Sequence, residues 1–154
     1  MELADLLTPA AVRVSSAVKS KKRLFQDLAE IAMAAHGIDE AIAIDALQER
    51  ESLGPTGVGH GVALPHARIE GIDSVRGIFV KLERPMEYGS VDRTSVDLVF
   101  ALFAPRDAGV EHLKALALVS RTLRDPAVCA KLRANDDPAK LFAILTERPD
   151  SKAA

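Results

Sequence analysis

The residue best suited to chemistry in this chain is His66, because it closes a segment unlike the rest of the sequence. Residues 54–66 read Gly-Pro-Thr-Gly-Val-Gly-His-Gly-Val-Ala-Leu-Pro-His, with four glycines and two prolines. Glycines let successive backbone N–H groups converge on an anion, and Pro65 restricts the backbone just before the histidine. A neutral imidazole nitrogen held there is a nucleophile for a phosphoryl group. The pattern favours a phosphoryl-carrying histidine, and an ordinary turn with a surface histidine is the alternative.

Nucleotide and metal sites fit the same residues less well. A P-loop needs a lysine after its glycines, whereas His60 and Gly61 follow Gly59 here, so nucleotide binding of that type is excluded. His60 and His66 are six residues apart with no cysteine near them in sequence, which leaves zinc as the weaker alternative. The single cysteine, Cys129, lies in an apolar helical stretch and is expected to be a small core residue.

The composition is that of a globular protein of a reducing compartment. The chain has 154 residues, 48% of them apolar and 27% charged, which suits one domain with its own core. A net charge of −2 gives no general attraction to nucleic acid, and one cysteine excludes an internal disulfide. The first residues lack the pattern of a signal peptide, and no uncharged run reaches the roughly 18 residues of a membrane helix. We therefore expect a cytoplasmic protein with no membrane insertion and no nucleic-acid partner.

The elements that must position His66 follow from hydrophobic periodicity and capping residues. We expect strands at 12–14, 77–82 and 96–103, helices at 21–36, 40–50 and 109–124, two further helices starting at 126 and 138, and a connection at 85–94. Ser20 and Asp39 are the expected N-caps of the first two helices. The near-continuous apolar run at 96–103 is typical of a central strand covered on both faces. Helices on both sides of the strands predict one α/β layered domain with a central mixed β-sheet.

Apolar residues at helical spacing give the expected inward faces. In the 40–50 helix, the residues expected to point inward are Ile42, Ala43, Ala46 and Leu47. In the 109–124 helix, the expected inward stripe is Leu113, Leu116, Ala117, Ser120 and Leu123. Around His66, the apolar residues Val58, Val62, Leu64 and Ile69 are expected to form an exposed docking patch.

The segment 57–66 resembles the signature of the IIA domains of the phosphoenolpyruvate-dependent phosphotransferase system. It is most similar to the fructose/mannitol class, and within that class to the nitrogen-related regulatory branch. Further similar segments lie at 6–9, 21–22, 50–54, 92, 96–99, 104–105 and 112–116. The resemblance covers residues 1–148 in order, and predicts a IIA type-2 domain over 1–148 with a frayed polar tail at 149–154.

This resemblance implies a role for particular residues. His66 matches the phosphoryl acceptor, His112 a second histidine that orients the phosphoryl group without carrying it, and Arg50 an arginine that stabilises its charge. The implied phosphate-binding loop consists of Thr56, Gly57, Gly59 and Gly61. His60 departs from the family, which commonly has a small polar residue there, and a tolerated substitution is the simpler interpretation. The resemblance implies no metal, nucleotide or other cofactor.

The implied function is that of a phosphoryl carrier with a regulatory output. An HPr-like protein would donate the phosphate to His66, and the phosphorylation state would control partners such as sensor kinases or potassium-transport components. One alternative is a sugar-specific IIA component that passes phosphate to a IIB domain. Another is a binding module that works without phosphorylation, and a metal-dependent hydrolase is the most distant.

Overall fold

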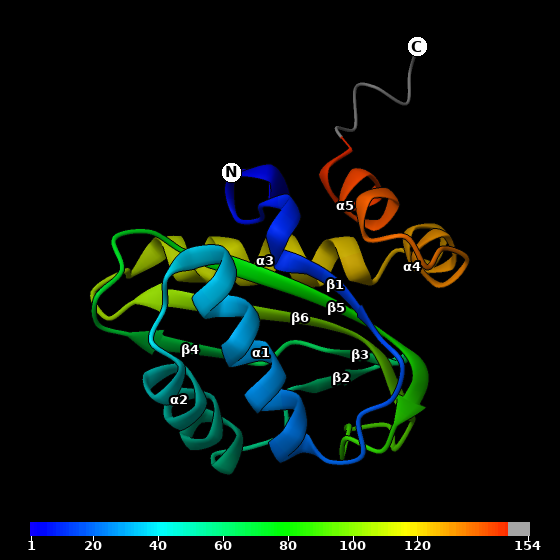
Figure 1. Cartoon of the computed structure of the whole chain (residues 1–154), viewed down its shortest axis with the longest axis horizontal. Helices are drawn as coiled ribbons and strands as arrows, with labels where there is room; N and C mark the ends of the chain where they lie inside the picture. The colour runs from blue at the N-terminus through cyan, green and yellow to red at the C-terminus, as the bar shows by residue number, and fades with distance from the viewer. Residues whose placement is uncertain (148–154) are drawn as a thin grey trace.

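The computed structural model describes residues 1–147, so the predicted tail at 149–154 lies outside the described residues. The elements are η1 (Leu3–Asp5), η2 (Pro9–Ala11), β1 (Val12–Ser15), α1 (Lys21–His36), α2 (Glu40–Ser52), β2 (Gly57–Gly59), β3 (Val62–Ala63), β4 (His66–Ile69), β5 (Arg76–Met86), β6 (Val96–Pro105), α3 (Val110–Leu123), α4 (Pro126–Arg133) and α5 (Pro138–Thr146). In Figure 1, α1 and α2 lie in front of the sheet and α3 lies behind it. The predicted α/β architecture, with helices on both sides of a mixed sheet, is confirmed.

Within residues 1–147 the sheet has six strands, in the order β1-β5-β6-β3-β2. The strand β4 also pairs with β6, further along the same edge as β3. The pairs β1–β5, β3–β6 and β4–β6 are parallel, whereas β5–β6 and β2–β3 are antiparallel. The sheet is therefore mixed, and its centre is the long pair β5–β6.

The central strand β6 is apolar along almost its whole length because both of its faces are covered. Every residue from Leu98 to Pro105 is buried, which confirms the prediction for this run. The strand β5 is longer than the predicted 77–82, since Met86 still pairs with Val96. The predicted connection at 85–94 therefore begins too early, and Pro85 belongs to the strand.

Four of the five α-helices in residues 1–147 begin directly after the residues predicted to precede them, and α2 runs two residues past its predicted end, to Ser52. The Ser20 side chain accepts a hydrogen bond from the Arg23 amide, and Gly37 ends α1 in the left-handed conformation. Asp39 caps α2 in the same manner. Aspartates 125 and 137 cap α4 and α5, each with proline at the first helical turn. Capping residues thus located the starts of α1, α2, α4 and α5 correctly, whereas α3 follows Gly109 without a side-chain cap.

The predicted inward faces of α2 and α3 are correct only in part. On α2, Ala43 and Leu47 are buried as predicted and Ala46 is half-buried, whereas Ile42 is exposed. On α3 the buried residues are His112, Ala115, Val119 and Leu123, so Leu123 is the one buried member of the predicted stripe, and Leu113 is 64% exposed. The buried stripe of α3 begins at His112, one residue before Leu113, because that face packs on the sheet.

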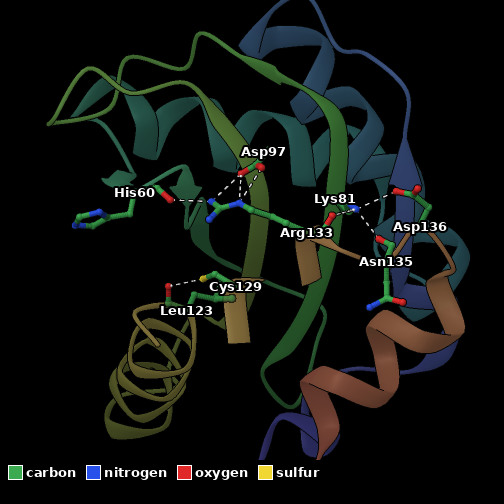
Figure 2. A network of polar contacts seen from close by, with 8 residues as sticks. All are labelled: His60, Lys81, Asp97, Leu123, Cys129, Arg133, Asn135 and Asp136. Atoms are coloured by element: carbon green, nitrogen blue, oxygen red, sulfur yellow. Dashed lines mark hydrogen bonds and ion pairs between the residues drawn. The ribbon is translucent and has the colours of Figure 1, made fainter. Parts of the chain in front are cut away.

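The C-terminal helices are tied to the sheet by two cations (Figure 2). Lys81, buried on β5, donates hydrogen bonds to the carbonyls of Arg133 and Asn135 and to the carboxylate of Asp136. Arg133 at the end of α4 binds the Asp97 carboxylate on β6 through two nitrogens and donates to the His60 carbonyl at 2.8 Å. The end of α4 and the residues that follow it are therefore anchored to β5 and β6, and Arg133 also holds the hairpin through the His60 carbonyl.

Candidate active site

The glycine segment folds into a short hairpin of β2 and β3, followed by the strand β4, and none of these three strands was predicted. β2 and β3 pair with each other, and the Leu64 amide donates to the Thr56 carbonyl at 2.8 Å. Leu64 and Pro65 separate β3 from β4 along the edge of β6, and the Pro65 carbonyl accepts a hydrogen bond from the Leu102 amide at 3.0 Å. The strand β4 begins at His66. The histidine is therefore the first residue of an edge strand that runs parallel to β6.

His66 is half-buried, and its tautomer follows from one contact. Its Nδ1 lies 2.8 Å from the Leu64 carbonyl, and because a carbonyl can only accept, Nδ1 carries the proton. The lone pair of the neutral ring is then on Nε2. Burial is the main cause that lowers the pKa of His66; the Leu64 hydrogen bond opposes it, Arg50 lowers the pKa further, and Glu51 has a smaller raising effect. The ring is consequently a neutral nucleophile at physiological pH.

His112 lies beside His66 and has the opposite tautomer. The two ring centroids are 5.6 Å apart in an edge-to-face arrangement. Arg68 Nε is 3.1 Å from His112 Nδ1, and because an arginine N–H can only donate, Nδ1 is unprotonated and Nε2 carries the proton. Burial lowers the pKa of His112 to about 4, with His66 and Arg68 adding to the shift. Its Nε2 is buried and has no hydrogen-bond partner among residues 1–147. The ring therefore holds an unused donor next to the nucleophile.

Both histidines open into a cavity of about 740 Å³. Its lining residues are Ile42, Asp45, Ala46, Glu49, Arg50, Leu53, His66, Ala67, Arg68, Ile69, Arg106, His112, Leu113 and Leu116. The predicted trio of His66, His112 and Arg50 is thus brought together from β4, α3 and α2. Three guanidinium groups, from Arg50, Arg68 and Arg106, outnumber the two carboxylates of Asp45 and Glu49, so the lining has a net formal charge of +1. Guanidinium groups are suited to binding phosphate.

Two of these arginines were missed in the sequence. Arg68 follows His66 by two residues, and alternate residues of a strand share a face, so recognising β4 would have placed them together. The polar-apolar alternation of β4 was the available signal. Arg106 follows the last residue of β6 and pairs only loosely with Glu70, at 3.7 Å. No local pattern identifies it.

The predicted phosphate-binding loop lies in and just before the hairpin, and Thr56, Gly57, Gly59 and Gly61 are not among the residues that line the cavity. Gly59 and Gly61 have φ of +98° and +80°, which other residues rarely adopt. A side chain at Gly57 would collide with Ser90. These contacts show how the segment supports the chain leading to His66. Direct phosphate contact by the loop stays a prediction.

A buried carboxylate fastens the start of the hairpin to α2. Glu51 accepts hydrogen bonds from the Thr56 amide, the Thr56 hydroxyl and the Tyr88 hydroxyl, and forms an ion pair with Lys21 at 2.9 Å. The Lys21 ammonium also lies 4.2 Å from the centre of the Tyr88 ring. Arg50, the residue before Glu51, donates to the Gly54 carbonyl at 3.0 Å. The end of α2 thereby fixes both Arg50 and the entry to the hairpin.

The apolar surface near the site differs from the predicted docking patch. Val62, Leu64 and Ile69 are buried, and of the four expected residues only Val58 is exposed. The exposed apolar side chains that line the cavity come from helices instead: Ile42, Leu53 and Leu113. Leu53 is the most exposed of these, at 80%. The predicted patch is wrong because the residues flanking His66 in sequence lie in or between strands of the sheet, where their side chains fill the core.

The other two histidines make structural contacts. His36 Nε2 lies 2.9 Å from the Gly77 carbonyl and donates to it, linking α1 to β5. His60 is at the tip of the hairpin with φ of +56°. Its amide donates to Asp92 and its carbonyl accepts from Arg133, so both backbone groups are held. Neither residue lines the cavity of His66.

Within residues 1–147, no group of three or more histidine, cysteine, aspartate or glutamate side chains is arranged to hold a metal ion. In the same part of the chain, no helix has both the length and the apolar character required to cross a bilayer.

Comparison with known proteins gives consistent matches over nearly the whole chain. Residues 5–148 match the family described as phosphoenolpyruvate-dependent sugar phosphotransferase system, EIIA 2. The nitrogen regulatory protein of Bradyrhizobium diazoefficiens is 41% identical over 153 residues, covering 99% of this chain and 100% of that protein. The corresponding protein of Escherichia coli K12 is 35% identical over 149 residues, covering 96% and 91%.

Solved structures agree with these matches. The nitrogen regulatory protein IIA-Ntr of Neisseria meningitidis has a TM-score of 0.86 and 30% identity, covering 94% of this chain and 99% of that one. The mannitol IIA protein of Escherichia coli has a TM-score of 0.75 at 19% identity, with 90% and 98% covered, and so shares the fold.

Proposed function

We propose that this chain, which belongs to the EIIA 2 family of the phosphoenolpyruvate-dependent sugar phosphotransferase system, carries a phosphoryl group on Nε2 of His66. Members of that family are phosphotransferase components. The observation that carries the proposal is the hydrogen bond from His66 Nδ1 to the Leu64 carbonyl, which leaves the Nε2 lone pair free. The arginine-lined cavity beside it suits a phosphoryl group.

The transfer requires no net movement of protons. The bond between phosphorus and the donor's histidine nitrogen breaks, and its electron pair stays on that nitrogen. The His66 Nε2 lone pair forms the new bond to phosphorus. The acceptor ring gains positive charge, and its Nδ1–H remains bonded to the Leu64 carbonyl, which stabilises that charge. Catalysis of such a step consists mainly of alignment and charge neutralisation.

The remaining groups act on the phosphoryl oxygens. The Nε2–H of His112 is a buried donor that lacks an acceptor, and a phosphoryl group on His66 would supply one. Arg50, fixed by its bond to the Gly54 carbonyl, would stabilise the negative charge. Both roles are those that the family resemblance implies for these two residues. The glycine hairpin would contribute by holding Leu64, and with it the nucleophile, in place.

The biological output we propose is regulation by phosphorylation state. Relatives with 41% and 35% identity bear the name nitrogen regulatory protein, and they match nearly the full length of the chain. An HPr-like carrier in the cytoplasm would donate the phosphate. Sensor kinases or potassium-transport components would be the regulated partners.

The test is incubation with phosphoenolpyruvate, enzyme I and an HPr-type carrier, followed by intact-mass measurement. We expect one phosphate per chain, stable in alkali and lost in acid, as for a phosphoramidate. The His66→Ala protein should take up none, while the control His36→Ala should be labelled normally. Undiminished labelling of His66→Ala would refute the proposal.

The supporting roles are tested by the rate of the same reaction. His112→Ala and Arg50→Ala should each slow transfer, by about 1–4 kcal/mol of transition-state stabilisation, as for the loss of one preorganised donor. Phosphate should still appear on His66. Phosphate found on His112 of the wild-type protein would overturn this division of roles.

A further inference from the structure

Within residues 1–147, the hydrogen bond from Arg68 is what determines which nitrogen of the His112 ring carries the proton. It projects from β4 two residues after His66, on the same face of the strand, and both residues line the cavity. Its Nε donates to His112 Nδ1 at 3.1 Å. This contact joins the strand that carries the nucleophile to the helix that carries its neighbour.

The contact selects one of the two neutral tautomers of the His112 imidazole. A neutral histidine has one N–H donor and one lone-pair acceptor, and the two can exchange. With Arg68 in place, Nδ1 is the acceptor and Nε2 the donor. With the proton on Nδ1 instead, Nε2 would present a lone pair, which repels phosphoryl oxygens. The positive charge of Arg68 also disfavours protonation of both nitrogens, in the same direction as burial.

The state that Arg68 selects is unfavourable in the protein as described. His112 is 6% exposed, and its Nε2 has no partner within residues 1–147. A buried N–H without an acceptor costs free energy, so such a group is expected where an acceptor arrives later. The neighbouring His66 ring, 5.6 Å away, is where the proposed phosphoryl group would bring acceptor oxygens.

We propose that Arg68 is a positioning residue for phosphoryl transfer, acting through His112 by holding it in the Nε2–H form that donates to the phosphoryl group on His66. The inference rests on the proposed function, because it names a further residue of the same site. Arg68 neither makes nor breaks a covalent bond in the step.

The first test measures the tautomer directly. Imidazole ¹⁵N chemical shifts of His112 distinguish a protonated from an unprotonated nitrogen, and they are recorded on unphosphorylated protein. Wild type should show protonated Nε2 and unprotonated Nδ1, Arg68→Met should show mixed tautomers, and Arg68→Lys should restore the wild-type pattern in part. The matched control is Arg106→Met, which removes the same charge from the cavity without touching a histidine.

The second test asks whether Arg68 acts through His112. Arg68→Met should slow transfer from the HPr-type carrier at least about tenfold, in keeping with the loss of one donor. In a His112→Ala background the same substitution should cause almost no further loss, because the residue through which it acts is gone. Circular dichroism of every variant establishes that the fold is retained.

Three results would decide the matter. An unchanged Nε2–H tautomer in Arg68→Met overturns the inference. So does an equal loss of rate in the wild-type and His112→Ala backgrounds, since Arg68 would then act on the phosphoryl group itself. A wild-type protein that accepts no phosphate refutes the proposed function, whereas the tautomer comparison needs no phosphate and is decided separately.

Discussion

Replacement of Glu51 by alanine should destabilise the protein strongly, although the residue takes no part in the proposed chemistry. The Glu51 side chain is 8% exposed and accepts bonds from Lys21, from Tyr88 and from two groups of Thr56. In the variant, Lys21 can turn to water because it is 30% exposed, and the Tyr88 hydroxyl still has the Thr56 hydroxyl at 2.8 Å. The Thr56 amide is left without its acceptor inside the protein.

The magnitude follows from these partners. A stranded buried donor costs about 1–3 kcal/mol, and loss of an ion pair whose lysine can reach water adds up to about 1 kcal/mol. We therefore expect Glu51→Ala to lower the free energy of unfolding by about 1–4 kcal/mol, measured by urea denaturation followed by circular dichroism. Glu30→Ala is the matched control, since Glu30 is an exposed glutamate of α1 and should change stability by less than about 0.5 kcal/mol.

The effect should also depend on pH with a definite sign. Burial acts to raise the pKa of Glu51, but hydrogen bonds from Thr56 and Lys21 outweigh it and hold the pKa below its usual 4.5. A carboxylate with a depressed folded-state pKa stabilises the fold above its unfolded-state pKa and loses that contribution as pH falls through the folded-state value. The difference in the free energy of unfolding between wild type and Glu51→Ala should thus be largest at neutral pH and shrink below pH 4.5. Equal stability of the two proteins at neutral pH would refute this account of the network.

Three further predictions concern the sheet, the hairpin and His112. Lys81→Met should lower the free energy of unfolding by about 2–4 kcal/mol in urea denaturation, because two backbone carbonyls lose a buried partner. Gly57→Ala should lower the melting temperature more than Gly37→Ala, since an added Cβ at 57 would collide with the backbone and side chain of Ser90, whereas at Gly37 it meets no atom and costs only the strain of a left-handed φ of +70°; a smaller effect at 57 would contradict the predicted clash. In an NMR titration, His112 should protonate with a pKa of about 4, and because this lies below the ordinary 6.5, acidification through that interval should destabilise the fold.

The sequence carried enough information for the framework but not for the full site. The continuous apolar run of β6 and the capping residues Ser20 and Asp39 are strong local signals, and all three were interpreted correctly. The strand β4 has four residues, which is too short for a periodic pattern to stand out beside a proline and several glycines. Missing β4 meant missing Arg68, the residue that shares its exposed face with His66.

The errors on the helices have a common physical cause. Ile42 and Leu113 were assigned to the core because apolar residues usually fill it, yet both line the cavity beside His66. His112, by contrast, was expected at the site and occupies the buried face of α3. Hydrophobic periodicity assumes that apolar means inward, and that assumption fails at a surface where apolar side chains surround a reactive group.

His66 and His112 are held in opposite tautomers, one by a backbone carbonyl and the other by a side chain. The two tautomers therefore differ in how easily a mutation can change them. Leu64 lies between β3 and β4, and the interruption at Pro65 leaves its carbonyl available to the His66 Nδ1–H. A backbone carbonyl persists through side-chain substitution, so the lone pair on His66 Nε2 is robust as long as the interruption is kept. His112 depends on the side chain of Arg68 and is open to a single mutation. Together the rings offer one nucleophile and one donor, which phosphoryl transfer requires; two lone pairs would repel the phosphoryl oxygens, and two donors would leave no nucleophile.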